Sequence, residues 1–352
     1  MLKFIKSAVK KLPGVSGLIA DRDALRLQYE DAAWHRDNLL SACNVLQEEL
    51  DETTSQPNAV IQDLKETKAK LTDLEKKLGF EPPGHYYSPI PSFEEIRKDE
   101  KRIFADVPQT IPGVELNNDT QLKLLSRFKS YYRDMPFQAE KQADLRYYYD
   151  NPAYSYSDGI FLHCMIRELK PRRIIEVGSG FSSCMIMDTN ELFFDGSIAT
   201  TFIEPHPELL MSLLTDADKS RTKTIPCRLQ DVDLDEFESL QANDILFIDS
   251  THVSKIDSDV NRIMFDILPR LASGVYIHFH DICFPFEYPK EWVLEGRAWN
   301  EAYLLKAFLQ FNNSFEVVLM STYLAKFHAP FLRENLPLCL ENPGGSIWIR
   351  KT

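Results

Sequence analysis

The sequence predicts an α/β protein with a doubly wound, seven-stranded sheet whose last strand is antiparallel, preceded by an N-terminal helical, coiled-coil-like arm. Short apolar runs rich in β-formers alternate with helical stretches from about residue 172 onward. Several of these runs end in an acidic residue, and a heptad-like pattern occupies the N-terminal region. With 44% hydrophobic and 26% charged residues among 352, the composition suits a packed core.

The chain is expected to divide into three segments. Residues 1–80 form a basic amphipathic start and the helical arm, residues 81–154 an aromatic-rich lead-in or cap, and residues 155–352 the α/β domain. The 53 acidic and 40 basic residues give a net charge of -13, which argues against a nucleic-acid partner.

Residues 1–14 carry four lysines and no acid, with apolar residues at helical spacing on the other face. This pattern has two interpretations: weak docking on an anionic membrane surface, or packing on a neighbouring element. In the arm, one heptad position is apolar throughout: Leu18, Leu25, Ala32, Leu39 and Leu46. A lone helix has nothing to bury so narrow an apolar stripe against. We therefore expect the arm to form a homo-oligomer, with packing on the chain's own body as the alternative.

Seven strands and two longer helices are expected beyond residue 118. The strands are 173–177, 200–204, 223–228, 244–249, 274–281, 315–320 and 346–350, and the helices are 119–133 and 298–311. The near-continuous apolar runs among them are typical of parallel strands buried on both faces.

A glycine turn follows the first strand. Gly178 and Gly180 in the run Glu176-Val177-Gly178-Ser179-Gly180 would let the backbone approach a ligand closely. Ser183 stands where the third glycine of a dinucleotide fingerprint would be. Glu204, Asp231 and Asp249 end or follow the next three strands. Because ligands of open α/β sheets gather at the carboxyl ends of the strands, this edge is the expected ligand site.

The order EVGSG, FIEP, QD and FIDSTH, followed by a glycine-led fifth strand and a terminal hairpin, resembles the class I S-adenosylmethionine-dependent methyltransferases over residues 155–352. The resemblance implies a Rossmann-like, S-adenosylmethionine-binding catalytic domain. Glu176, Gly178, Ser179 and Gly180 would hold the methionine part of the cofactor; Glu204 would bind its ribose, and Asp231 would lie beside its adenine, with Asp249 also at the cofactor. Gly344-Gly345 would be the hairpin tip before the antiparallel last strand.

The fourth and fifth strands end in Asp249-Ser250-Thr251-His252 and His280-Asp281. This arrangement is similar to the metal-dependent sugar O-methyltransferases of the macrolide-tailoring kind. The similarity implies that Asp249 and Asp281 are metal ligands and that His252 is the general base. His280 stands where that family has Glu, so it is either a third ligand or a hydrogen-bonded core residue, and a bound Mg²⁺ or Mn²⁺ or no metal remain alternatives. His278, on the same strand face, is expected in the core.

The expected function is O-methylation of a glycan or glycosylated small molecule. The rival functions are an NAD-linked oxidoreductase on a similar sheet and a non-catalytic scaffold. The aromatic loop 284–292 is interpreted as a substrate-binding edge or as a segment anchored to the body. Six scattered cysteines without a CxxC pair, and no apolar run of about 18 residues, favour a cytoplasmic protein.

Overall fold

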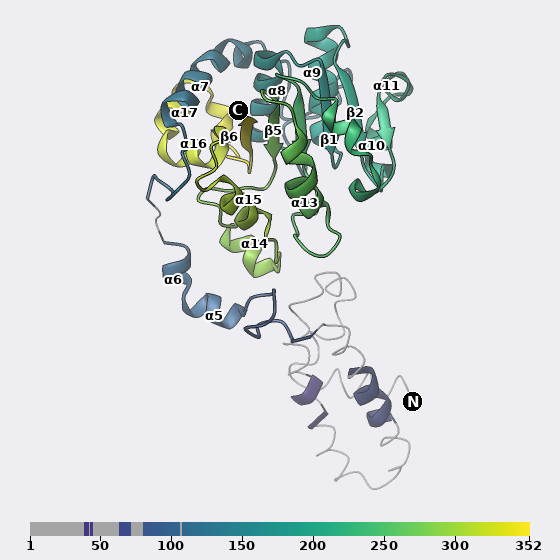
Figure 1. The fold of residues 1–352 in the computed structure, drawn as a ribbon, viewed down its shortest axis with the longest axis vertical. Helices are drawn as coiled ribbons and strands as arrows, with labels where there is room; N and C mark the ends of the chain where they lie inside the picture. The colour runs from purple at the N-terminus through teal and green to yellow at the C-terminus, as the bar shows by residue number, and fades with distance from the viewer. Residues whose placement is uncertain (1–38, 42, 45–62, 72–79, 106–107) are drawn as a thin grey trace. The chain divides into compact units, whose positions relative to one another are not determined.

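The computed structural model describes residues 39–41, 43–44, 63–71, 80–105 and 108–352. Its contacts divide the chain into two units, one of Met1–Asp106 with Lys290–Ala298 and one of Val107–Pro289 with Trp299–Thr352. Residues 39–41, 43–44 and 63–71 are helical (Figure 1). The basic start 1–14 and most of the heptad pattern lie outside the described residues, so the oligomer and the membrane contact stay predictions. No described helix is long and apolar enough to cross a membrane.

Besides these segments, the described part of the first unit contains three short helices: α5 (Phe93–Lys98), α6 (Glu100–Ile103) and α14 (Lys290–Glu295). Ser92 begins α5 by accepting a hydrogen bond from the Glu95 amide. Lys290 of α14 pairs with Glu100 of α6 at 2.6 Å, which ties two segments that are far apart in the sequence.

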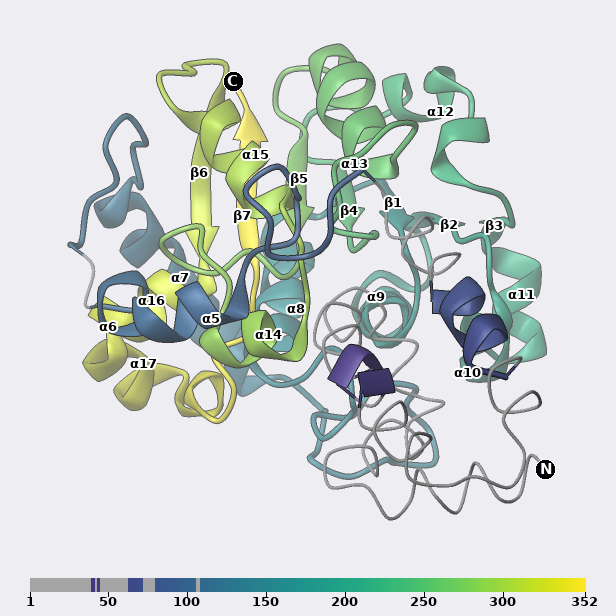
Figure 2. The same cartoon turned by 90° about the horizontal axis from the view of Figure 1, so that it is seen from below.

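The second unit contains the sheet. Its strands are β1 (Arg173–Val177), β2 (Ala199–Ile203), β3 (Lys223–Ile225), β4 (Ile245–Ile248), β5 (Tyr276–Phe279), β6 (Phe315–Met320) and β7 (Ile347–Lys351). They are ordered β3-β2-β1-β4-β5-β7-β6, and Figure 2 shows them in this order from right to left. β1 to β5 are parallel, whereas β7 is antiparallel to both β5 and β6. The predicted seven-stranded sheet with an antiparallel last strand is confirmed.

Two helices of this unit precede the first strand, and the others lie in the connections between strands. They are α7 (Asn118–Arg133), α8 (Ser157–Leu169), α9 (Phe181–Phe194), α10 (Glu208–Leu213), α11 (Asp216–Arg221), α12 (Leu234–Glu238), α13 (Asp259–Arg262), α15 (Glu301–Leu309), α16 (Ser321–Phe327) and α17 (Ala329–Asn335). A 3₁₀ turn at Leu229–Asp231 follows β3, and a π-helical turn at Ile263–Ile267 follows α13.

Apolar side chains from the helices close over the buried strands. β1, β4 and β5 are almost entirely buried, as expected for central parallel strands. On one flank, Met187 of α9 and Leu210 of α10 pack with Phe202 of β2. Helix α7 packs on α8, since Phe128 of α7 and Phe161 of α8 are both fully buried with their ring centroids 6.3 Å apart.

The predicted hairpin tip at Gly344-Gly345 is wrong. The chain leaves β6 at Met320 and passes through α16 and α17 before it returns as β7, so the connection is long and helical. Close contacts explain the two glycines instead. A Cβ on Gly344 would lie 2.2 Å from Asp158 Oδ1, and one on Gly345 would lie 3.0 Å from the Asp281 Cα. The two glycines therefore let the segment before β7 pass close to Asp158 of α8 and to Asp281 after β5.

Candidate active site

The turn after β1 depends on Gly178. This residue has φ +83°, and a Cβ there would lie 1.9 Å from the Asp249 carbonyl oxygen. Glycine therefore lets the ends of the adjacent strands β1 and β4 come together. Gly180 differs, because a Cβ there would meet nothing closer than Leu209 at 3.7 Å.

Glu176 is fully buried at the end of β1 and is bound to the start of α9. Its carboxylate accepts hydrogen bonds from the hydroxyls of Ser182 and Ser183, the second at 2.6 Å. Burial outweighs these bonds and raises the pKa of Glu176 to about 8. The residue thus fixes the strand-to-helix turn, and its predicted contact with a cofactor stays a prediction.

A hollow of about 400 Å³ opens beside this turn, at the carboxyl ends of β1, β2 and β4. Its lining includes Gly178, Glu204, His206, Arg228, Leu229, Gln230, Asp249, Ser250 and Thr251. The Glu204 carboxylate accepts from the His206 amide at 2.8 Å. Among the described residues, the buried hydroxyls of Ser179 and Ser250 have no hydrogen-bond partner. Because a buried polar group without a partner costs free energy, these hydroxyls fit a polar ligand in this part of the site.

Asp231 does not line this hollow. It lies in the 3₁₀ turn after β3, where its carboxylate pairs with Arg228 at 3.0 Å, and it borders a separate depression near Lys223. The two residues that precede it, Leu229 and Gln230, line the hollow instead. Sequence reasoning singled out the acid of the LQD run and missed its two neighbours.

Two aspartates and two histidines meet where β4 and β5 end, as the strand pattern predicts. His252 Nε2 lies 3.4 Å from Asp249 Oδ1 and 3.6 Å from Asp281 Oδ2. His280 Nδ1 lies 3.3 Å from Asp249 Oδ1 and 3.6 Å from Asp281 Oδ1. Each carboxylate therefore lies between the two imidazoles. Asp249, His280 and Asp281 offer ligand atoms within 4.8 Å of one another, which suits a single metal ion.

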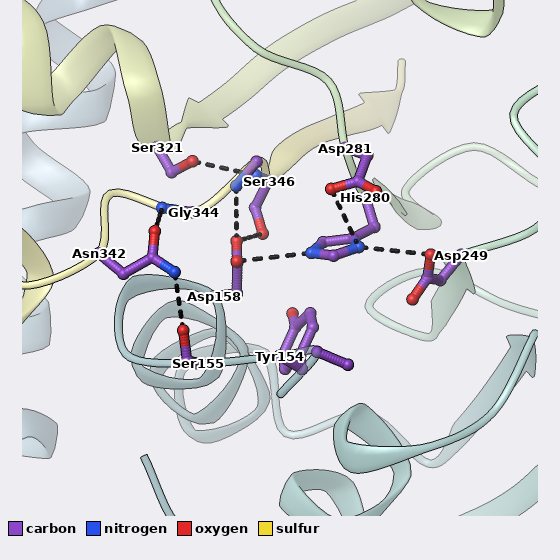
Figure 3. A network of polar contacts seen from close by, with 12 residues as sticks. Tyr154, Ser155, Asp158, Asp249, His280, Asp281, Ser321, Asn342, Gly344 and Ser346 are labelled. Carbon is purple, nitrogen blue, oxygen red and sulfur yellow. Dashed lines mark hydrogen bonds and ion pairs between the residues drawn. The ribbon is translucent and has the colours of Figure 1, made fainter. Parts of the chain in front are cut away.

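Each imidazole also contacts a buried acid through its other ring nitrogen. His252 Nδ1 is 2.9 Å from Glu301 Oε2, at the start of α15. His280 Nε2 is 3.4 Å from Asp158 Oδ2, in the first turn of α8 (Figure 3). Glu301 is 1% exposed and Asp158 3% exposed. Sequence reasoning missed both acids, because no strand pattern connects α8 or α15 to these loops.

The backbone of His252 is held by the same helix. Its carbonyl oxygen accepts from the amides of Asn300 and Glu301 at 3.1 and 3.2 Å. His252 has φ +59°, a left-handed conformation that is uncommon outside glycine. The Trp299 ring covers the imidazole with the centroids 4.4 Å apart. These contacts set both the position and the direction of the side chain.

The charges of the cluster shift its pKa values in opposite directions. Burial opposes the charged imidazole, but hydrogen bonds to Asp249 and Glu301 outweigh it and raise the pKa of His252 to about 10. The charges of Asp249 and Asp281 likewise outweigh burial and raise the pKa of His280. Burial would raise the pKa of Asp249, yet the two histidines hold it well below its usual range. Positive charge is therefore favoured between the two aspartates.

His278 is a core residue, as predicted. It is fully buried, and its Nε2 is 2.9 Å from the Ser346 hydroxyl. The loop after β5 is anchored to the body, since Phe284, Phe286 and Tyr288 are all buried. The Tyr288 hydroxyl accepts from the Ala302 amide at 3.0 Å, which joins the loop to α15.

Comparison with known proteins finds one family model and one relative by sequence. Residues 175–282 match the model of a methyltransferase domain. An uncharacterized protein of Archaeoglobus fulgidus is 37% identical over 167 residues, which are 46% of this chain and 74% of that protein.

Solved structures also match at low similarity. An S-adenosylhomocysteine-bound methyltransferase from Podospora anserina is 15% identical, with a TM-score of 0.36 over 75% of this chain and 99% of that one. The O-methyltransferase of tomaymycin synthesis from Streptomyces achromogenes, in complex with S-adenosylmethionine, is 14% identical, with a TM-score of 0.38 over 73% of this chain and 96% of that one. The family match identifies a methyltransferase domain in residues 175–282, and the seven-stranded sheet with its antiparallel last strand is the fold that the resemblance to the class I S-adenosylmethionine-dependent methyltransferases implies.

Proposed function

We propose that this methyltransferase methylates a hydroxyl oxygen of a sugar, glycan or glycosylated small molecule, with His252 as the general base and a divalent cation at Asp249, His280 and Asp281. The observation that carries the proposal is the placement of His252. One ring nitrogen faces the two aspartates and the other faces a buried glutamate, beside a hollow that Asp249 also lines.

The hollow supports the cofactor part of the proposal. Gly178 after β1 and Glu204 after β2 lie on its wall, and the buried hydroxyls of Ser179 and Ser250, which have no hydrogen-bond partner, follow β1 and β4. Glu204 would bind the ribose, as carboxylates at the end of the second strand do in related sheets. When bound, S-adenosylmethionine supplies a methyl carbon attached to a positively charged sulfur.

His252 then has a defined task. The acceptor hydroxyl would give its proton to Nε2 of His252, and its oxygen would receive the methyl group that bound S-adenosylmethionine supplies, which leaves S-adenosylhomocysteine. Glu301 fixes the imidazole through Nδ1, so the accepting nitrogen stays directed at the cluster. Proton removal by a positioned histidine typically contributes a factor of about 10² to 10⁴ in rate.

A divalent cation fits the same cluster. The ligand atoms of Asp249, His280 and Asp281 lie within 4.8 Å of one another, and His280 Nδ1 is buried without a hydrogen-bond partner. Without a cation, the two carboxylates stabilise protonated histidines. A cation between them would take over this role and leave His252 neutral, which is the form that accepts a proton.

Trp299 supports a sugar acceptor. Its ring lies beside the proposed base, with 4.4 Å between the centroids, and aromatic faces stack on the apolar faces of sugar rings. Tyr288 of the anchored loop supports Trp299, with 6.0 Å between the ring centroids.

The test is a transfer assay with labelled S-adenosylmethionine and extracts of glycans, glycosides and other metabolites, run with and without EDTA. The proposal predicts label on an oxygen of a sugar-containing product, its loss with EDTA, and its loss in His252→Ala. His328→Ala is the matched control, because that imidazole contacts Asn118 and Tyr323 instead.

Four results would contradict the proposal. Full activity of His252→Ala would exclude the base, and label on nitrogen or carbon would exclude O-methylation. No transfer to any acceptor would favour the scaffold alternative, and tightly co-purified nicotinamide cofactor would favour the oxidoreductase alternative.

A further inference from the structure

We propose that Asp158 is a positioning residue that fixes His280 as a nitrogen ligand, and that the centre consequently prefers Mn²⁺ or Co²⁺ to Mg²⁺. The inference rests on the metal centre of the proposed function and extends it to a residue on a distant helix and to the identity of the ion.

Asp158 is fixed from one side by the segment that leads into β7. Its Oδ1 accepts from the Gly345 amide at 3.0 Å and from the Ser346 hydroxyl at 2.6 Å. The close approach of Gly344 leaves no room for a side chain, since a Cβ there would lie 2.2 Å from the same oxygen. With Oδ1 occupied twice, Oδ2 is the oxygen directed at His280 (Figure 3).

This contact orients the imidazole of His280. With Oδ2 at 3.4 Å, Nε2 carries the hydrogen, because a carboxylate can only accept. Nδ1 is then free to use its lone pair toward the metal site. It lies 3.3 Å from Asp249 Oδ1 and 3.6 Å from Asp281 Oδ1, and it is buried with no hydrogen-bond partner. Tyr154 covers the ring with the centroids 5.1 Å apart, which restricts its rotation.

When a buried carboxylate contacts the imidazole that binds an ion, the carboxylate sets the tautomer of the imidazole and raises its basicity. An imidazole nitrogen suits first-row transition ions, whereas Mg²⁺ prefers an all-oxygen shell. With His280 as one of the three ligands, the site is therefore expected to prefer Mn²⁺ or Co²⁺ to Mg²⁺.

The test measures ion binding to the purified full-length protein, without substrate, by electron paramagnetic resonance of Mn²⁺ and by competition with Mg²⁺. We expect Asp158→Asn to weaken Mn²⁺ binding about 10- to 100-fold, the range found for such outer partners. The carbonyl of the new amide would accept from Gly345 and Ser346, so its NH₂ group would face His280 and force the proton onto Nδ1.

Two further variants make the test specific. Ser155→Ala removes a nearby hydroxyl that contacts Asn342 instead of Asp158, so it should keep Mn²⁺ affinity within about threefold of the wild type. His280→Glu restores a carboxylate, so the ratio of Mn²⁺ to Mg²⁺ affinity should fall at least tenfold.

The inference would be overturned if Asp158→Asn bound Mn²⁺ as tightly as the wild type. It would also be overturned if the wild type and His280→Glu had the same ratio of Mn²⁺ to Mg²⁺ affinity. Failure of the wild type to bind any divalent ion would also overturn it. Calorimetry with S-adenosylhomocysteine on the same samples keeps the two proposals apart. Normal cofactor binding without ion binding removes only the metal centre, whereas loss of cofactor binding in the wild type would remove the proposed function itself.

Discussion

Replacing Glu301 with Gln tests how His252 is held. The carboxylate contacts His252 Nδ1 at 2.9 Å, and the two residues are only 1% and 5% exposed, so water screens the contact little. A hydrogen bond to a buried charged group is worth about 1.5–3 kcal/mol. If this free energy is lost only when the imidazole takes up the proton, kcat should fall about 10- to 150-fold, since about 1.4 kcal/mol corresponds to a factor of ten.

The assay separates positioning from folding. Steady-state kinetics of Glu301→Gln should show the fall in kcat with an unchanged KM for S-adenosylmethionine, and calorimetry should give an unchanged affinity for S-adenosylhomocysteine. Glu316→Gln is the matched control, because Glu316 lies on the edge strand β6 and pairs with the partly exposed Arg350 at 3.1 Å. A Glu301→Gln enzyme with wild-type kcat and wild-type thermal stability would refute the reasoning.

The remaining predictions concern the turn, one ion pair and one buried histidine. Gly178→Ala should lower cofactor affinity at least tenfold in calorimetry, because its Cβ would meet the Asp249 carbonyl at 1.9 Å. Gly196→Ala is the control: Gly196 also has a positive φ, but a Cβ there would meet no atom within 4 Å, so this variant should bind the cofactor normally. Arg146→Met should lower the free energy of unfolding in urea by about 3–5 kcal/mol, because it leaves the buried Asp188 and Asp218 without their cation; an effect below about 1 kcal/mol would contradict this. His163 is fully buried, and burial lowers its pKa to about 3, so the native state resists protonation and stability is lost as pH falls below about 6.5. At pH 5.5 this loss is about 1.4 kcal/mol, and His163→Phe should remove that part of the pH dependence of urea unfolding; an identical pH profile would show that His163 does not cause it.

The sequence predicts the sheet, and it predicts that the polar residues after the fourth and fifth strands lie together. Both predictions are possible because the strands have a regular hydrophobic pattern. Parallel strands buried on both faces are apolar along their length, so their first polar residues mark the carboxyl edge of the sheet. Asp249, His252, His280 and Asp281 are found in this way, because strands β4 and β5 are neighbours.

The rest of the site depends on contacts that no periodic pattern records. Glu301 begins a helix 49 residues after His252, and Asp158 lies 122 residues before His280. The role of Gly344 and Gly345 is equally hidden, since a glycine pair before a strand is typical of a tight turn, but here it lets the chain pass Asp158. Asp231 illustrates the limit within a short turn, where the acid pairs outward with Arg228 and its neighbours face the hollow.

The central claim is that the cofactor binds at the carboxyl edge of β1, β2 and β4, next to His252. Titration calorimetry of the full-length wild type with S-adenosylhomocysteine, with Glu204→Ala in parallel, tests it most directly. The account predicts one binding site per chain in the wild type and at least tenfold weaker binding in Glu204→Ala, whose carboxylate lines the hollow. No binding to the wild type at millimolar ligand, or equal binding to both proteins, would contradict it.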